Sequence, residues 1–144
     1  QGILQGNGAA PTTWVIISTS LLNMLRTAGD GSHLIGAISK NIEHIVGFAF
    51  VDDTDLVTSR IGDWSITEDE IMYRMQTAIN RWEGGLKATG GAIVPEKSWV
   101  YPIAFEFDEH GKWHYKSVAD IDVQFNVKDK DDQLQHLPQL DAHM

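Results

Sequence analysis

The sequence Ile45-Val-Gly-Phe-Ala-Phe-Val51 is followed at once by Asp52-Asp53 and then by Thr54-Asp55-Leu56-Val57-Thr58. A mostly apolar run of seven residues and a second short run with β-branched side chains are typical of two strands. Aspartate tolerates the dihedral angles of tight turns, so Asp52-Asp53 predicts the turn between these strands. We therefore expect a β-hairpin with both carboxylates at its tip.

A helix is expected before this hairpin. Pro11 suits the first turn of a helix, because the N–H that proline lacks has no partner there. Gly29 can cap the C-terminal end. The apolar residues of the predicted helix fall on one face and are Trp14, Ile17, Leu21, Met24 and Ala28. The β-branched residues at 12–17 favour a strand instead. We prefer the helix, because its stripe extends over about fifteen residues, which is long for a strand.

A second helix is expected after the hairpin. Thr67 and Glu70 have the spacing of a capping box. The glycine pair Gly84-Gly85 should fray or end this helix, since glycine is unfavourable in a helix interior, and Gly90-Gly91 is its outer limit. The predicted buried stripe consists of Ile71, Met75, Ala78, Ile79, Trp82 and Leu86.

Strands are expected in the last third of the chain, over 99–107, 113–116 and 121–127, with a turn at 109–111. Alternating aromatic residues in such strands most often face a core, although they could also stack on bases. The aromatic residues concerned are Trp99, Phe105, Phe107, Trp113 and Tyr115. The acidic segment after Lys128 is expected to be loose.

The composition excludes several classes of protein. The chain has 144 residues, which suits one globular domain, and it has no cysteine, which excludes disulfides and thiolate metal sites. The longest apolar run, 45–51, is far shorter than the roughly 20 residues of a membrane span. A net charge of -9 disfavours binding of nucleic acid through a broad basic surface. Contact with phosphates must then depend on metal ions at a site, or on basic parts outside this segment.

Paired aspartates at the tip of a hairpin suit a two-metal site for phosphoryl transfer. Such a site needs oxygen ligands on a rigid element that hold two divalent ions about 4 Å apart. The dipeptide alone is weak support, because a second Asp-Asp pair occurs at Asp131-Asp132. The setting strengthens it: an apolar strand precedes Asp52-Asp53, an aromatic residue stands two positions before Asp52, and another strand follows.

Three motifs of the chain resemble the palm domain of reverse transcriptases. Phe50-Val51-Asp52-Asp53 resembles the aromatic-x-Asp-Asp box of that family, and Gln5-Gly6-Asn7-Gly8-Ala9-Ala10-Pro11 is similar to its upstream Gln-Gly box. The segment 86–98, with Gly90-Gly91 and Lys97, resembles the box that follows. The three boxes occur in the order of the family, and the phenylalanine at position 50 is more typical of enzymes of non-LTR retrotransposons.

The resemblance implies an α+β fold, in which an antiparallel, hairpin-containing sheet packs on two helices. Residues 1–100 would form a partial palm domain, and residues 101–144 a β-hairpin and a truncated continuation beyond it. The chain would be a palm fragment truncated at both ends, without the fingers and thumb of the same polypeptide. The full-length protein would be an RNA-directed DNA polymerase of a retroelement, while the isolated fragment is expected to be inactive.

The resemblance also implies roles for single residues. Asp52 and Asp53 would be catalytic and would bind two Mg²⁺ ions, with Mn²⁺ as an alternative metal. Lys97 would stabilise or protonate the departing pyrophosphate. Gln5 and Gly6 would lie against the incoming nucleotide and the template, and the aromatic Phe50 belongs to the same nucleotide- and template-binding group. The partners would be an RNA template, a DNA primer and a dNTP, and no membrane is expected among them. The location stays open between cytoplasm and nucleus.

Two departures from the family pattern leave alternatives open. Ala10 stands where the family usually has serine, and the third metal-binding aspartate of the family would lie upstream of Gln5. Gln5-Gly6 could be only the lead into a helix, and Lys97 only a solvated lysine. A non-catalytic interaction module derived from a degenerate retroelement is the main alternative function. A different metal-dependent phosphotransferase with a similar palm is another.

Overall fold

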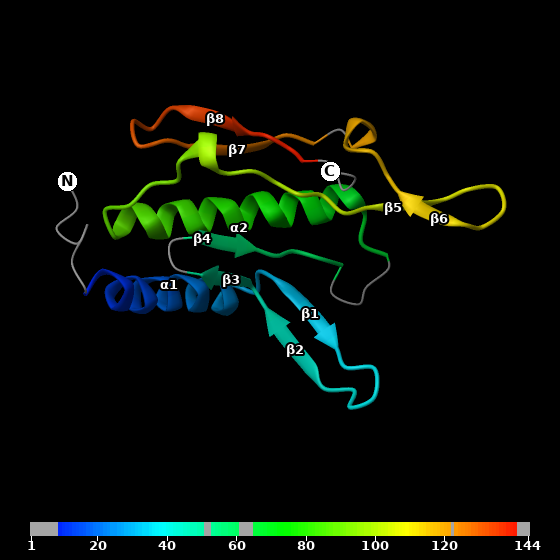
Figure 1. Cartoon of the computed structure of the whole chain (residues 1–144), viewed down its shortest axis with the longest axis horizontal. Coiled ribbons are helices and arrows are strands. Elements are labelled where there is room, and N and C mark those ends of the chain that lie inside the picture. The colour runs from blue at the N-terminus through cyan, green and yellow to red at the C-terminus, as the bar shows by residue number, and fades with distance from the viewer. Residues whose placement is uncertain (1–8, 51–52, 61–64, 122, 141–144) are drawn as a thin grey trace. The chain divides into compact units, whose positions relative to one another are not determined.

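Two α-helices and eight strands, with two short 3-10 helices, make up the described part of the chain. The computed structural model describes residues 9–50, 53–60, 65–121 and 123–140. Each strand pairs antiparallel with its neighbour in sequence (Figure 1). The expected α+β class is confirmed, although these residues form four separate two-stranded ladders instead of one continuous sheet.

The chain divides into two units, residues 1–90 and residues 91–144. The first unit contains both α-helices and the hairpins β1–β2 (Ser32–Ile35 and Ile42–Ile45) and β3–β4 (Gly47–Phe50 and Asp53–Leu56). The second contains β5–β6 (Phe105–Phe107 and Trp113–Tyr115) and β7–β8 (Phe125–Lys128 and Leu134–Leu137). The structural division follows Gly90, whereas the sequence predicts a boundary between residues 100 and 101. Lys97 therefore belongs to the second unit.

Helix α1 spans Ala10–Thr27 and has Pro11 in its first turn, so the predicted helix is confirmed and the alternative strand is wrong. The helix forms because its apolar side chains recur at helical spacing, which outweighs the β-branched residues near its start. Its buried residues are Ser18, Leu21 and Leu25. The predicted stripe is thus only partly right: Met24 is 37% exposed, because the buried face is rotated toward Leu25.

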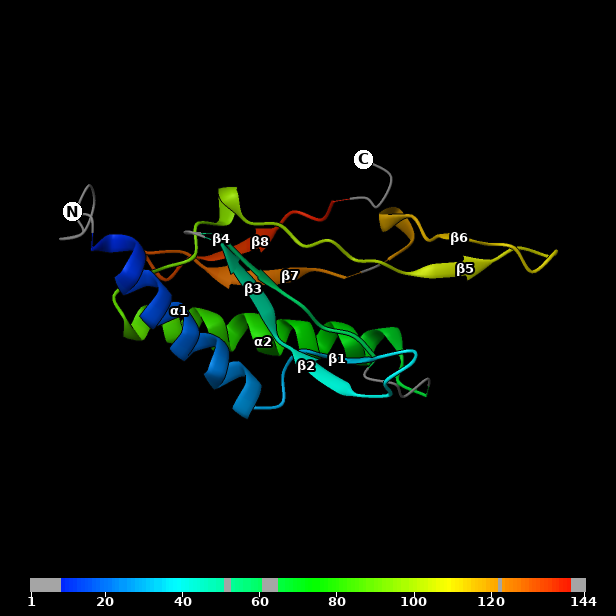
Figure 2. The ribbon, with the colours of Figure 1, turned by 60° about the horizontal axis from the view of Figure 1, so that its bottom comes forward.

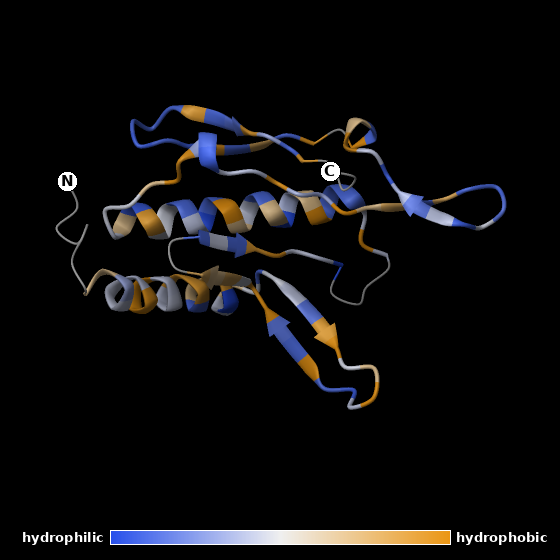
Figure 3. Cartoon of the chain, in the orientation of Figure 1, coloured by the Kyte–Doolittle hydropathy of each residue, from blue (hydrophilic) through white to orange (hydrophobic). Residues whose placement is uncertain are grey.

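Helix α2 spans Glu68–Ala88. The Thr67 hydroxyl accepts the N–H of Glu70 at 3.2 Å, as predicted for the capping box, while the Glu70 carboxylate pairs with Arg74 at 3.0 Å. Apolar and polar residues alternate along the helix (Figure 3). The buried residues include the C-terminal members of the predicted stripe and are Ala78, Ile79, Trp82, Gly85 and Leu86.

The glycine pair in α2 does not end the helix, contrary to the prediction. Gly85 is buried, and a Cβ at that position would lie 2.6 Å from Leu21 Cδ2 and 3.0 Å from Met24 Cε, both on α1. Gly84 has no atom within 4 Å of a Cβ. The absence of a side chain at Gly85 lets α1 approach α2 closely, so packing compensates for the poor helix propensity of glycine.

The two glycines should respond in opposite ways to substitution. Gly84→Ala should raise the free energy of unfolding by about 0.5 to 1 kcal/mol, because alanine favours the helix and meets no neighbour. Gly85→Val should lower it by about 1 to 3 kcal/mol, since the branched side chain overlaps Leu21. Urea denaturation of both variants would measure these changes. Equal effects of the two substitutions would contradict the close packing of Gly85 against α1.

The β5–β6 hairpin of the second unit exposes its aromatic residues. Strand β5 spans Phe105–Phe107 and β6 spans Trp113–Tyr115, with Phe105 opposite Tyr115 and Phe107 opposite Trp113. The prediction that these aromatic residues face a core is wrong: Phe105, Phe107 and Trp113 are each more than half exposed. The rings of Phe105, Trp113 and Tyr115 contact one another, with the centroids of Phe105 and Tyr115 5.1 Å apart.

The prediction that the acidic segment after Lys128 is loose is wrong for the described residues 129–140, which include strand β8. Strand β7 spans Phe125–Lys128, and β8 spans Leu134–Leu137. Asp129 closes the turn between them: its carboxylate accepts the backbone N–H of Gln133 at 2.9 Å and the side-chain N–H of Gln135 at 3.0 Å. These hydrogen bonds lower the pKa of Asp129 below its ordinary value, because they favour the charged form.

The turn at Asp129 should therefore weaken in acid. Because the folded-state pKa is lowered, the stabilisation is present above the unfolded pKa of roughly 4 and is lost as the pH falls through the folded pKa. Amide hydrogen exchange at Gln133 and Gln135 should accelerate in this acid range, beyond the intrinsic pH dependence of exchange. Asp129→Asn should remove the extra pH dependence, and Asp131→Asn should retain it. An unchanged profile in Asp129→Asn would refute the assignment.

Candidate active site

The β3–β4 hairpin carries the predicted aspartate site. Strand β3 spans Gly47–Phe50 and pairs with β4, Asp53–Leu56, so that Phe50 lies directly opposite Asp53. The predicted hairpin is confirmed. The turn predicted at Asp52-Asp53 is wrong at Asp53, which begins β4. The two residues that join the strands, 51 and 52, lie outside the described residues.

Cross-strand pairing places aromatic and acidic side chains on one face of this hairpin. Residues directly opposite each other share a face, and so do residues two apart along a strand. The face formed in this way is exposed and consists of Phe48, Phe50, Asp53 and Asp55. Thr54 and Leu56 point to the other face and are half-buried. This alternation makes Asp53 a strand residue, whereas local turn propensity favours it as a turn residue.

Asp55 is a carboxylate of this face that the predicted site does not include. It lies opposite Phe48, two residues after Asp53, so the two Cα atoms are separated by roughly 7 Å along the strand. The signal in the sequence is the alternation Asp53-Thr54-Asp55-Leu56, in which every second residue is acidic. Together the two carboxylates give the face a negative potential that attracts cations.

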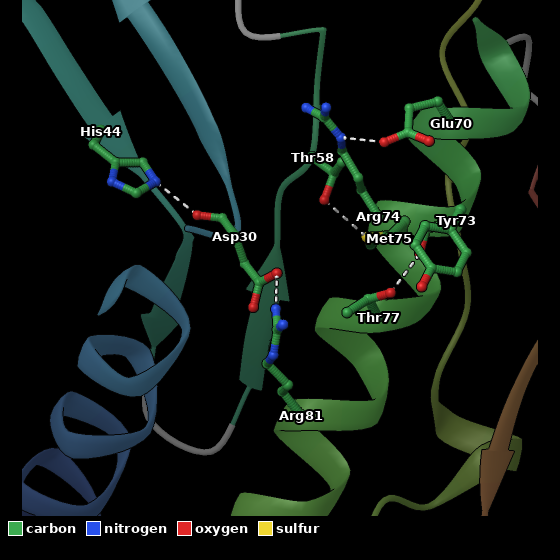
Figure 4. A network of polar contacts seen from close by, with 9 residues as sticks. All are labelled: Asp30, His44, Thr58, Glu70, Tyr73, Arg74, Met75, Thr77 and Arg81. Atoms are coloured by element: carbon green, nitrogen blue, oxygen red, sulfur yellow. Dashed lines mark hydrogen bonds and ion pairs between the residues drawn. The ribbon is translucent and has the colours of Figure 1, made fainter. Parts of the chain in front are cut away.

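The inner end of the hairpin is anchored to the rest of the first unit. Buried Val46 precedes β3, and its carbonyl accepts the N–H of Val57 at 3.1 Å, which extends the ladder by one pair. The Thr58 hydroxyl lies 3.5 Å from the Met75 sulfur on α2 (Figure 4). Ser59 and Ser32, the first residue of β1, share a hydrogen bond of 2.5 Å between their hydroxyls. These contacts hold the base of the hairpin, while Phe50 and Asp53 at the outer ends of the two strands are exposed.

Gly47 sets how closely the two strands approach. A Cβ at this position would lie 2.3 Å from the backbone oxygen of Asp55 and 3.3 Å from Leu56 Cδ2. Backbone cannot move aside as a flexible side chain can, so any larger residue must displace β4. The glycine therefore fixes the position of Asp55 and, through the ladder, that of Asp53.

Substitution of Gly47 should distort the hairpin. Gly47→Ala should lower the free energy of unfolding by about 1 to 3 kcal/mol, because the added methyl group overlaps the Asp55 carbonyl. Chemical denaturation and the amide chemical shifts of β3 and β4 would measure the effect. Ala49→Ser, on the same exposed strand, is the control and should change stability by less than about 0.5 kcal/mol. A Gly47→Ala variant with unchanged β4 shifts would show that the close approach is not required.

The other predicted site residues lie as follows. Phe50 is 78% exposed, directly opposite Asp53. Lys97 is exposed and ends the 3-10 helix η1, Pro95–Lys97, in the second unit. Gln5, Gly6 and Asp52 lie outside the described residues. Within the described part of the chain, no group of three or more His, Cys, Asp or Glu side chains is placed to hold a metal ion.

Comparisons with known protein families, sequences and structures find no similar protein. No family model, no curated protein sequence and no solved structure matches the chain. Neither α-helix in the described part combines the length and the apolar character needed to cross a bilayer.

Proposed function

We propose that the chain is part of the palm domain of a reverse transcriptase, and that the longer protein is an RNA-directed DNA polymerase of a retroelement. The observation that carries the proposal is the β3–β4 hairpin, in which Phe50 and Asp53 of the aromatic-x-Asp-Asp box lie opposite each other. The element order also supports it, because α1 follows the Gln-Gly box, the β3–β4 hairpin comes after β1–β2, and α2 leads to the segment with Lys97.

In this proposal Asp52 and Asp53 hold two Mg²⁺ ions together with an aspartate upstream of Gln5. Magnesium is bound by few carboxylates and otherwise by water and phosphate oxygens, and an exposed strand end such as that of Asp53 leaves room for these ligands. Held by these carboxylates, the ions would supply positive charge for attack of a primer 3′-hydroxyl on the α-phosphate of a dNTP, with pyrophosphate as the leaving group.

The remaining residues of the three boxes would position the substrates. Phe50 offers an exposed ring beside Asp53, where it can contact the nucleotide or the template. Gln5 and Gly6 would lie against the template and the incoming nucleotide, since glycine permits close approach of backbone. The Lys97 ammonium group would neutralise charge that develops on the departing pyrophosphate.

A non-catalytic interaction module is the second candidate function. The exposed aromatic residues Phe105, Phe107 and Trp113 favour it, because an aromatic face of this kind is common where proteins bind a partner. The two candidate functions predict different sequences upstream of this segment. An intact strand that ends in aspartate favours the enzyme, and its loss in the parent reading frame favours the module.

The polymerase proposal makes a direct prediction for the full-length protein. Asp52→Asn and Asp53→Asn should each lower extension of a DNA primer on an RNA template by at least about a hundredfold, because each removes a charge that holds the metal ions. Primer extension with labelled dNTP in the presence of Mg²⁺ is the measurement.

Asp131→Asn is the matched control. It changes one residue of the other Asp-Asp pair, which lies between β7 and β8, and it should leave extension unchanged. Undiminished synthesis by both the Asp52 and the Asp53 variants would refute the site. Loss of synthesis in Asp131→Asn as well would show that the measured loss is not specific to this site.

A further inference from the structure

The β1–β2 hairpin, which the sequence does not predict, brings two histidines together. Strand β1 spans Ser32–Ile35 and β2 spans Ile42–Ile45, with His33 directly opposite His44. Just beyond the last strand pair, Ile35 and Ile42, the N–H of Gly36 donates to the carbonyl of Asn41, so these two residues form a hydrogen-bonded pair. Because hydrogen-bonded and non-hydrogen-bonded pairs alternate along an antiparallel ladder, the histidines form a non-hydrogen-bonded pair, where opposite side chains are closest.

The two imidazole rings are close and accessible. Their centroids are 4.4 Å apart and their planes are inclined by 34°. Both side chains are half-buried, so solvent reaches the pair. His33 forms no hydrogen bond with another described residue. Among the described residues, none therefore occupies its ring nitrogens, and a ligand can reach them.

The hydrogen bond of His44 determines which of its nitrogens is available. His44 Nε2 lies 2.6 Å from the backbone oxygen of Asp30 (Figure 4). A carbonyl can only accept, so Nε2 carries the proton, and Nδ1 of the neutral ring keeps its lone pair. A hydrogen bond from the second nitrogen of the ring to a backbone carbonyl is the usual support of a metal-binding histidine.

Asp30 is itself held in place. Its carboxylate is 8% exposed and pairs with the guanidinium group of Arg81 on α2. The carbonyl that accepts the hydrogen bond from His44 therefore belongs to a residue whose side chain is buried and paired with Arg81. This fixed acceptor limits the movement of the His44 ring.

We propose that His33 and His44 form a bis-imidazole site for a divalent transition-metal ion such as Zn²⁺. The ligands are Nδ1 of His44 and one ring nitrogen of His33. In a tetrahedral zinc site two nitrogen ligands lie roughly 3.3 Å apart, which follows from Zn–N distances of about 2.0 to 2.1 Å. The two rings are partly stacked, with planes inclined by 34°, and imidazole lone pairs lie in the ring plane. Binding therefore requires the His33 ring, which forms no hydrogen bond with another described residue, to turn until its lone pair and that of His44 Nδ1 point to the same ion. Water or a carboxylate of a partner completes the coordination.

This site is independent of the proposed polymerase site. Imidazole favours zinc, copper and nickel, whereas Mg²⁺ prefers oxygen ligands. The histidine pair lies on another hairpin of the first unit and shares no residue with the aspartate site. Failure of one proposal leaves the other unaffected.

Calorimetric titration of the chain with Zn²⁺ tests the proposal. We expect one binding event that His33→Asn weakens by more than about tenfold, because a single imidazole cannot chelate. His33→Asn is the preferred variant, since it leaves the hydrogen bond between His44 and Asp30 in place. Zinc should also raise the melting temperature of the parent chain but not that of His33→Asn, because a ligand that binds only the folded state stabilises it.

His114→Asn is the matched control, because His114 also lies on a two-stranded ladder but faces Glu106 instead of a second histidine. It should bind Zn²⁺ as the parent does. Mg²⁺ should not displace the zinc. Equal zinc affinity of His33→Asn and the parent would identify an adventitious ion only and overturn the proposal, as would the absence of any zinc binding by the parent.

Discussion

The pairing register of β3 and β4 is the constraint on which the candidate active site depends. Side chains alternate between the two faces of a strand, so a shift by one residue would exchange the faces of Asp53 and Thr54. Gly47 fixes the register at one end, because only a residue without a side chain fits against the carbonyl of Asp55. The exposed face then presents two phenylalanines and two aspartates together.

Anchoring of the hairpin base explains why the outer ends of its strands can remain exposed. The hydrogen bond between Val46 and Val57 extends the ladder inward, and Thr58 and Ser59 join the hairpin to Met75 on α2 and to the buried Ser32. Figure 2 shows β2 leading into β3, so the two hairpins of this unit follow each other along the chain. A rigid base with exposed strand ends suits a site for large charged substrates, because Asp53 keeps its position without burial.

Much of the first unit follows from local patterns. Pro11, the Thr67 capping box and the apolar periodicity predict both helices, because these signals act within a few residues. The existence of the β3–β4 hairpin follows from two short runs around an acidic turn signal. The end of α2 does not follow, because the packing of Gly85 against α1 involves residues far away in the sequence. The β1–β2 hairpin is not predicted for a related reason, since its two short strands bury only Ser32 and show no alternation of buried and exposed residues.

The second unit departs further from local expectation. Its alternating aromatic residues are typical of strands that face a core. In β5–β6, however, no other described element of the unit covers them, and Phe105, Phe107 and Trp113 are each more than half exposed. What the amino-acid order determined by itself is the pair of helices, the aspartate hairpin and the succession of motifs, since each is encoded in neighbouring residues. Which carboxylates share a face, how close α1 lies to α2 and which histidines meet were decided only in the folded chain, because these relations depend on strand register and on contacts between distant segments.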